Sequence, residues 1–516
     1  MDALLVTLAL AGVLLAVLYY LSVRNFGYWK KRGVPFIKPL PLIGSQLSVL
    51  ALREHIGDYF DRYARKYKGQ RFVGFFQGNT PALIVMDPEL VKAIIVKDFS
   101  HFVDHAFEVS EESDPMQSRN LFNMRGQKWR EMRNKLSPTF TSGKMKGMYP
   151  LVEECAKNVE SFIRQHQNEN IDIKDLLARF TTDVIGSCAF GVSIDSVYEP
   201  HNQFRAMGKR MLEVDFIQGM KNAFIIVFLP ELAKLFKFKF FPEEVNDFFR
   251  NLVKQIVSQR TKTGNMRKDF MQLLIQLKQL GKLKQDDEVE KSEHEGWAAV
   301  QTDYKLTDDD IVAQALVFFF AGFETSSSNM TFAMLELARY PDVQQKARDN
   351  IEEVLQRHNG QMSYQALQEM TFLDWIMLES LRMYPPVTVI NRVCTKNYKI
   401  PDTDLTLEKG DLVMIPNRAL QNDPDYFENP EVFDPERFRD EERNHKNQFV
   451  FLPFGEGPRQ CIGMRFAKMQ SKLGLYTILR NFEIVSSPKT VYPPKWDPKQ
   501  FLLVAKDDIF VQLKAL

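Results

Sequence analysis

The chain has 516 residues and a formal net charge of +1. It is long enough for one large domain or two ordinary ones, and its near-zero charge creates no global field that would favour nucleic acid or an acidic partner. Its 41 Phe residues supply material for a large apolar core or pocket. No C-x-x-C pair occurs, which argues against a zinc site or a disulfide framework and favours a cytosol-facing body; the scattered cysteines are Cys155, Cys188, Cys394 and Cys461.

The N-terminus carries an uncharged, apolar run from Ala3 to Val23. As a helix rising about 1.5 Å per residue, this run spans about 30 Å, which matches the hydrocarbon core of a bilayer. Only Asp2 precedes it, whereas four basic residues follow, and this asymmetry places the remaining chain in the cytosol; they are Arg24, Lys30, Lys31 and Arg32. A cleaved signal peptide is the alternative, but the missing basic segment and the length of the run favour an anchor.

The next segment, residues 24–45, is basic and rich in proline. Three prolines within residues 33–45 predict a stiff, extended linker that acts as a hinge between anchor and body, although an ordinary loop would also fit. The predicted organisation is therefore an anchor at 1–23, a linker at 24–45 and one body at 46–516.

The sequence of the body predicts mainly helix with minor sheet. Helices are expected near His55–Tyr67, at Pro88–Lys97 and over most of 127–285, with breaks at several Pro and Gly residues that include Pro150, Pro242 and Gly264. Residues 101–126 look irregular, and residues 286–305 predict a charged surface loop. Alternation and turn residues predict strands at Arg71–Gln77 and Thr80–Met86, joined at Gly78-Asn79, and at Val389–Val393, Asp411–Ile415 and Ile509–Leu513.

The segment Leu235–Phe241 alternates aromatic and basic residues. A solvated strand edge or helix end would explain this pattern. A patch that dips into the membrane interface is the sharper hypothesis.

A long helix is predicted from Thr307 to Tyr340, just before Pro341. Thr307 followed by Asp310 forms a capping-box pattern. Residues 311–323 are apolar almost all round, which is typical of a helix buried through the middle of a domain.

The buried helix is interrupted by the segment Ala321-Gly322-Phe323-Glu324-Thr325. The small residues Ala321 and Gly322 would leave room for a small ligand, the Thr325 hydroxyl could donate a hydrogen bond, and the Glu324 carboxyl could relay protons. A local bulge would admit water. Alternatively, the hydroxyls from Thr325 to Ser328 bond back to helix carbonyls.

The stretch from Phe454 to Gly463 frames one cysteine with glycines just before a predicted helix. The glycines allow close approach of a flat, bulky group. A helix N-terminus favours the thiolate of Cys461, and the fork of Arg459 suits a carboxylate. Together these features describe a socket for haem held by sulfur, although a Cys in an apolar setting can also be a small buried hydrophobe.

This stretch, Phe-Gly-x-Gly-x-Arg-x-Cys-x-Gly, resembles the haem-binding signature of the cytochrome P450 superfamily at every defined position. The resemblance implies haem b with Cys461 as axial ligand and Phe454, Arg459 and Gly463 around it. It also implies the cytochrome P450 fold, mainly α with minor β-sheet, behind an N-terminal transmembrane anchor helix. The segment Ala321–Thr325 resembles the oxygen-activating helix of the family, with Glu324 and Thr325 in the catalytic positions.

Further motifs follow the family order. Glu379-x-x-Arg382 with Arg437 of Pro-Glu-Arg-Phe resembles the structural brace of the haem pocket. Trp129-x-x-x-Arg133 and Arg392 resemble residues that hold the haem propionates. Gln421 departs from the family, because relatives often have His there, and this puts a secondary contact in doubt.

The resemblance implies a microsomal monooxygenase on the cytosolic face of the endoplasmic reticulum membrane. NADPH would supply electrons through a flavoprotein reductase, with cytochrome b5 as a further donor. The phrase around Ala321–Ser328 resembles insect members that metabolise xenobiotics, which favours lipophilic plant toxins or insecticides as substrates. Endogenous lipids or hormones, a reductase-independent haem-thiolate isomerase and a non-catalytic haem carrier are the alternatives. A basic docking face for the reductase would comprise Lys128, Arg130, Lys135, Arg465, Lys468 and Lys472.

Overall fold

The computed structural model describes residues 2–212, 239–264, 266–281, 304–439 and 448–516. Most of these residues are helical, and three small sheets accompany them, which confirms the predicted fold class. Most of Leu235–Phe241 and of the loop predicted at 286–305 lies outside the described residues.

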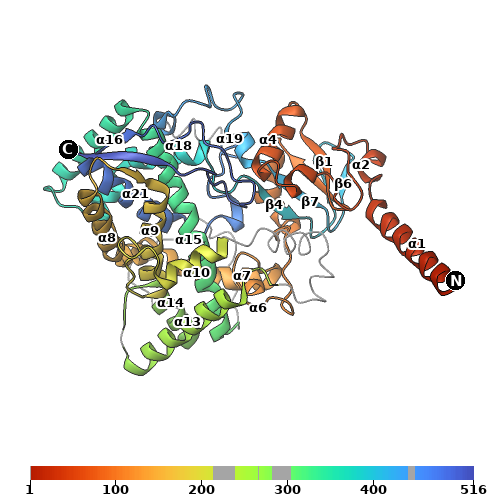
Figure 1. Ribbon diagram of the computed structural model, residues 1–516, viewed down its shortest axis with the longest axis horizontal. Coiled ribbons are helices and arrows are strands. Elements are labelled where there is room, and N and C mark those ends of the chain that lie inside the picture. The colour runs from red at the N-terminus through yellow and green to blue at the C-terminus, as the bar shows by residue number, and fades with distance from the viewer. Residues whose placement is uncertain (1, 213–238, 265, 282–303, 440–447) are drawn as a thin grey trace.

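The helix α1 (Asp2–Val23) projects from the body on the side that carries β1 (Phe72–Gln77) and α4 (Ile56–Lys66), as Figure 1 shows. Its apolar side chains are exposed, and Leu15 retains 66% of its surface. In the described part of the chain, two helices are long and apolar enough to cross a membrane, but only this one is exposed rather than built into the body. The helix is therefore a candidate membrane anchor.

The segment predicted as a stiff, extended linker packs on the first strand. Trp29, in α2 (Tyr28–Lys31), is fully buried, and its Nε1 donates to the Phe75 carbonyl at 2.9 Å. The backbone of Gly74 bonds to both Pro35 and Ile37 at 2.8 Å. A side chain on Gly74 would collide with the Trp29 ring, so glycine is required at this close approach. The apolar surface that Trp29 and Ile37 bury stabilises this packing.

The largest sheet has the strand order β1-β2-β7-β4, with β2 at Thr80–Val85, β7 at Leu412–Ile415 and β4 at Ile390–Val393. The predicted hairpin is confirmed, because Gln77 pairs with Thr80 across the Gly78-Asn79 turn. β7 then pairs in parallel with β2, and β4 pairs antiparallel with β7. Arg392 of β4 is thereby brought from the C-terminal half of the chain to the sheet near the N-terminus.

Two smaller sheets complete the strands of the described residues. β9 (Phe510–Ala515) lies between β3 (Asn170–Asp172) and β8 (Phe482–Ser486), and β5 (Tyr398–Lys399) pairs with β6 (Thr406–Leu407). Only β9 was expected from the sequence. The others are short, and pairing with distant segments stabilises them.

The helical part is built around α15 (Asp308–Leu337), which Figure 1 shows crossing the body between α9 (Ile173–Ile185) and α18 (Thr371–Met383). The predicted capping box is confirmed: the Thr307 hydroxyl accepts from Asp310 N, and the Asp310 carboxylate accepts from Thr307 N. The helix ends at Leu337, short of the predicted Tyr340. It is α-helical throughout residues 321–325, so the expected bulge is absent from this described segment.

The remaining helices mostly follow the predicted breaks. Pro242 precedes α13 (Glu243–Thr263), which ends at Gly264 with a φ of 67°. The predicted helix at Pro88–Lys97 consists of α5 (Pro88–Lys92) and a π-helical turn (Ala93–Lys97). Pro150, however, lies inside α8 (Ser142–Gln165). The carbonyl that loses its helical partner belongs to the exposed Lys146, where water can satisfy it.

Candidate active site

The loop from Phe454 to Gly463 places Cys461 at the start of α21 (Met464–Asn481). Gly455 and Gly457 have φ values of 69° and 72°, in the region that favours glycine. A side chain on Gly457 would overlap the carbonyl oxygen of Ile95. The Cys461 N–H then donates to the Phe454 carbonyl at 2.8 Å. The glycines thus form the tight turn that the sequence predicts.

Cys461 differs in exposure from the other cysteines of the chain. Cys461 is exposed, whereas Cys155, Cys188 and Cys394 are buried. Burial nevertheless raises the pKa of its thiol, and a hydrogen bond from Gly463 and the charge of Arg133 oppose that shift. A metal bound to this accessible sulfur would favour its thiolate form.

Buried positive charge collects beside this sulfur. Burial lowers the pKa values of Arg133 and Arg392 to about 10. Burial, together with repulsion from Arg392 and Arg133, lowers the pKa of Arg459 to about 8, although Asp104 lies 3.6 Å from its Nη2. The buried Nε of Arg392 has no hydrogen-bond partner among the described residues. The cluster therefore has the chemistry of an anion site.

Arg459 itself does not form the predicted carboxylate clamp. Its guanidinium lies over the ring of Trp129, 4.0 Å from the ring centroid, and within the described part of the chain its hydrogen bonds go to backbone groups. These acceptors are the carbonyls of Val103, Leu121, Phe122 and Met124, at 2.7 to 3.3 Å. Arg459 thus fixes the irregular 101–126 stretch and contributes charge rather than a free fork. Trp129 and Arg133 share α7 (Gly126–Leu136), as predicted.

The predicted oxygen-binding segment of α15 is only partly as expected. Ala321 is exposed and Thr325 half-exposed, one turn apart on the same face. The Thr325 hydroxyl donates to the Ala321 carbonyl at 2.6 Å, which is the back-bonded arrangement considered as the alternative. Burial raises the pKa of Glu324, while Lys174 and a hydrogen bond from Ser328 oppose the rise. Glu324 can therefore hold a proton at a higher pH than an ordinary carboxyl group.

Gly322 has a different role from the one predicted. A side chain there would lie 2.5 Å from Ile185 of α9, so the glycine allows close packing with that helix rather than space for dioxygen. On its other side, the Gly322 carbonyl accepts a hydrogen bond from Gln470 of α21 at 3.1 Å. This contact joins the central helix to the helix that begins beside Cys461.

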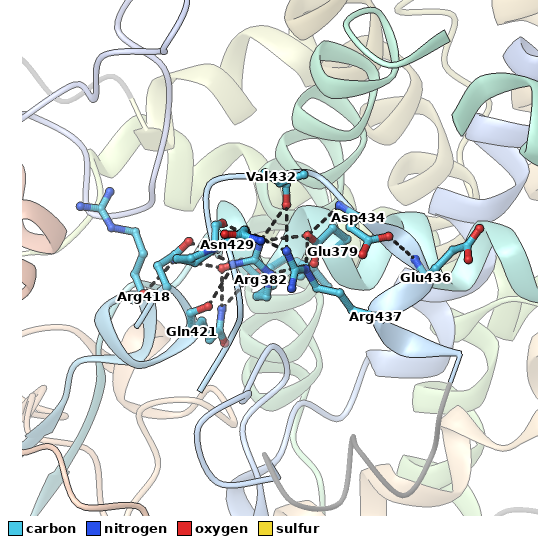
Figure 2. Close-up of polar contacts among 12 residues, drawn as sticks. Glu379, Arg382, Arg418, Gln421, Asn429, Val432, Asp434, Glu436 and Arg437 are labelled. Carbon is cyan, nitrogen blue, oxygen red and sulfur yellow. Dashed lines mark hydrogen bonds and ion pairs between the residues drawn. The ribbon is translucent and has the colours of Figure 1, made fainter. Parts of the chain in front are cut away.

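The three charged residues of the predicted brace meet, as Figure 2 shows. Arg382 binds both carboxylate oxygens of Glu379 at 2.7 and 2.8 Å, and both side chains are fully buried. The Nε of Arg437 donates to Glu379 at 3.3 Å. Arg382 also donates to the Gln421 carbonyl, and the Gln421 Oε1 accepts from Leu452 N. Gln421, the departure from the family pattern, is therefore hydrogen-bonded through both its backbone and its side chain.

Comparison with known proteins decides the family. The sequence pattern of cytochrome P450 matches residues 34–511. "Cytochrome P450 9e2" of Blattella germanica is 38% identical, over 98% of this chain and 97% of its own length. "Probable cytochrome P450 6a14" and "Cytochrome P450 6a2" of Drosophila melanogaster are also 38% identical, over 99% and 100% of both chains, respectively. The chain belongs to the cytochrome P450 family. It is therefore an oxidoreductase of the monooxygenase type that uses haem and a redox partner.

The residues of this cytochrome P450 fit the haem that its family implies. Haem presents an iron that binds thiolate and two carboxylates that require countercharge. Cys461 supplies an accessible sulfur, and the unpaired Nε of Arg392 lies in a cluster short of negative charge. Arg133 and Arg392 would hold the carboxylates, while Arg459, which lies over the Trp129 ring, would add positive charge nearby.

Two contacts of this site carry no signal in the sequence. His105 lies 3.4 Å from Arg392 and stacks on Phe122, and burial and Arg392 lower its pKa well below the ordinary value. Gln470 reaches Gly322. Neither belongs to a motif with spacing that reveals it, because both contacts join segments far apart in the chain.

The assignment of Lys472 to the predicted docking face is wrong. Lys472 is buried and pairs inward with Asp374 at 2.8 Å. It cannot contact a redox partner, because both its charge and its donors are used within the protein. The side chain of Lys128, by contrast, retains 72% of its surface.

Proposed function

We propose that this cytochrome P450 is an NADPH- and O2-dependent haem-thiolate monooxygenase that hydroxylates or epoxidises lipophilic small molecules, principally xenobiotics such as plant toxins or insecticides. Residues 1–23 anchor it in the endoplasmic reticulum membrane, residues 24–45 join the anchor to the body, and the catalytic domain at 46–516 faces the cytosol. A flavoprotein reductase delivers the electrons, with cytochrome b5 as a second donor.

The observation that carries the proposal is the accessible sulfur of Cys461 beside buried arginines with lowered pKa values. When bound, haem supplies the redox chemistry that activates dioxygen and inserts one oxygen atom into substrate. Cys461 holds the iron as the thiolate, and the N–H of Gly463 steadies its charge. Phe454 and Gly463 bound the turn that presents it.

Proton delivery falls to the turn of α15 that carries Glu324 and Thr325. Glu324 retains its proton readily because it is buried, and Thr325 carries a hydroxyl beside Ala321 on the same helix face. Rotation of the Thr325 hydroxyl away from the Ala321 carbonyl would let it pass a proton onward. Retention of both groups favours a monooxygenase over an isomerase, which needs no proton supply.

Exposed apolar side chains on two joined loops support lipophilic substrates. Phe501 and Val387 keep 47% and 40% of their surface although their neighbours Leu502, Leu503 and Thr388 are buried. The ring of Phe501 meets that of Phe107 edge-on at 6.3 Å, and the backbone bond from Leu503 N to Pro386 O joins the two loops. Such surfaces bind apolar molecules by burial rather than by directed hydrogen bonds.

The test replaces Cys461 with alanine and uses Cys155→Ala as the matched control. In the reduced protein under carbon monoxide, Cys461→Ala should lose the thiolate-type absorption band, whereas Cys155→Ala should keep it, because Cys155 is buried in the helical core. Retention of that band by Cys461→Ala would overturn the ligand assignment. Turnover of hydroperoxides without NADPH, and none with NADPH and reductase, would instead favour the isomerase.

A further inference from the structure

Gln470 is a buried polar residue without an obvious reason to be polar. Its side chain is fully buried in α21, and it makes one hydrogen bond, from Nε2 to the Gly322 carbonyl at 3.1 Å. Its Oε1 is buried without a partner among the described residues. A buried, unsatisfied amide oxygen costs about 1–3 kcal/mol, and an apolar side chain of the same size would avoid that penalty. Stability alone therefore does not explain the glutamine.

The hydrogen bond of Gln470 reaches the turn of α15 that carries the proton-delivering residues. Gly322 lies between Ala321 and the proton-delivering pair Glu324-Thr325. Because Gly322 lacks a side chain, α15 approaches Ile185 of α9 on one side, while Gln470 holds the carbonyl on another. This turn of α15 is thus fixed between two helices.

The contact also joins the two sides of the proposed reaction centre. α21 begins at Met464, directly after the loop that presents Cys461. Its close approach to α15 continues at Gly474, where a side chain would lie 2.7 Å from the Met330 sulfur. The Gln470 amide therefore fixes the turn that carries Thr325 relative to the helix that carries the thiolate, by a directional bond that apolar packing does not supply.

We propose that Gln470 is a positioning residue: its bond to the Gly322 carbonyl holds Ala321 and Thr325 in register with Cys461, so that protons arrive where dioxygen is activated. The inference rests on the proposed function. When the register is lost, the two electrons from NADPH and two protons leave with dioxygen as hydrogen peroxide, and substrate is not oxidised.

The test compares Gln470→Leu with Gln344→Leu in the full-length, haem-loaded protein. Gln344 is also a buried glutamine, and its amide donates to the Leu337 and Ile484 carbonyls at 2.7 Å, away from Gly322. Gln344→Leu should lower the melting temperature and leave the ratio of product to NADPH consumed unchanged. Gln470→Leu should keep or raise the melting temperature while that ratio falls roughly fivefold, the factor that corresponds to one neutral hydrogen bond.

A second readout does not depend on turnover. The infrared C–O stretch of the reduced carbon monoxide complex reports the groups above the haem, so it should shift or broaden in Gln470→Leu and match the wild type in Gln344→Leu. If Gln470→Leu leaves both the stretch and the product ratio unchanged, the inference is wrong. If the wild type itself lacks the thiolate-type band, the proposed function fails instead.

Discussion

His55 shows how one buried side chain links stability to pH. It caps α4, since its Nδ1 accepts from Gly57 N at 2.9 Å, and its Nε2 lies 3.2 Å from the Leu502 carbonyl. These two contacts require the neutral ring with a proton on Nε2. Burial and the neighbouring Arg418 accordingly lower the pKa of His55 to about 4. The ring thus ties α4 to the loop that presents Phe501.

We expect this histidine to destabilise the protein in mild acid. An unfolded histidine titrates near 6.5, so between about pH 6.5 and 4 the unfolded chain binds more protons and the free energy of unfolding falls as the pH falls. Complete loss amounts to about 3 kcal/mol at most. Urea unfolding of wild type and His55→Asn at pH 7 and pH 5 measures the effect. Asparagine can still cap Gly57 but does not titrate, so its free energy of unfolding should change less.

If the free energy of unfolding depends on pH equally in the two proteins, that expectation is wrong.

Asp183 titrates in the same pH range, because burial raises its pKa to about 6. Its contribution has the opposite sign, since the folded state then binds the extra proton and the free energy of unfolding rises as the pH falls. Both proteins contain Asp183, so its effect cancels in the comparison.

At the residue scale, the sequence predicts those site residues whose motifs are local. Cys461 and its glycines lie in one ten-residue stretch, and Glu379 and Arg382 share one helix face. Gly322 shows the limit of prediction from local motifs. A glycine in this helix suggests open space, yet its small size allows α15 to contact Ile185. The bonds of Gln470 and the stacking of His105 depend on how distant helices and loops cross, which spacing along the chain does not encode.

At the element scale, the brace joins α18 to the loop that carries Arg437. Glu379 pairs with both Arg382 and Arg437, and its Oε1 also accepts from Asp434 N at 3.0 Å. Arg382 in turn holds the Pro430 carbonyl at 2.8 Å. One buried carboxylate thus fixes a long irregular segment in the C-terminal third of the chain, as Figure 2 shows.

Removal of that carboxylate should be severe. Glu379→Ala leaves buried guanidinium groups without countercharge, and we expect the free energy of unfolding to fall by about 3–5 kcal/mol. Glu153→Ala is the control, because Glu153 pairs with the exposed Lys157 in α8 and such surface pairs contribute about 0.5 kcal/mol or less. Chemical denaturation of both variants measures the difference. A loss of similar size in both would show that the brace is unimportant for stability.

Elements are predictable to the extent that their signals are local. The α15 capping box and the β1–β2 turn have such signals, and both are confirmed. β8 continues directly from α21 without a break in the apolar pattern, and only its pairing with β9 makes it a strand. Pro150 is the converse case, since a usual helix breaker is tolerated where water reaches the freed carbonyl.

At the scale of the whole molecule, the boundary between anchor and body lies earlier in the chain than composition suggests. α1 leaves its apolar surface exposed, whereas Trp29, only six residues beyond Val23, is completely buried against β1. Of the basic residues that follow α1, Lys30 and Lys31 lie directly after Trp29 in α2, the first helical turn of the folded body. The proline-rich composition that predicts a hinge instead suits a segment that runs extended along the sheet edge.

Two variants separate these contributions. Deletion of residues 1–23 removes exposed apolar surface, so the protein should leave the membrane fraction while its free energy of unfolding stays within about 0.5 kcal/mol of the full chain. Trp29→Ala in the full chain should stay membrane-bound yet lose about 3–5 kcal/mol, because the cavity and the lost bond to Phe75 lie in the core. Membrane partition and thermal denaturation measure both. If Trp29→Ala has the same free energy of unfolding as the wild type, the packing of residues 24–45 on β1 does not stabilise the body. The segment then acts as a hinge.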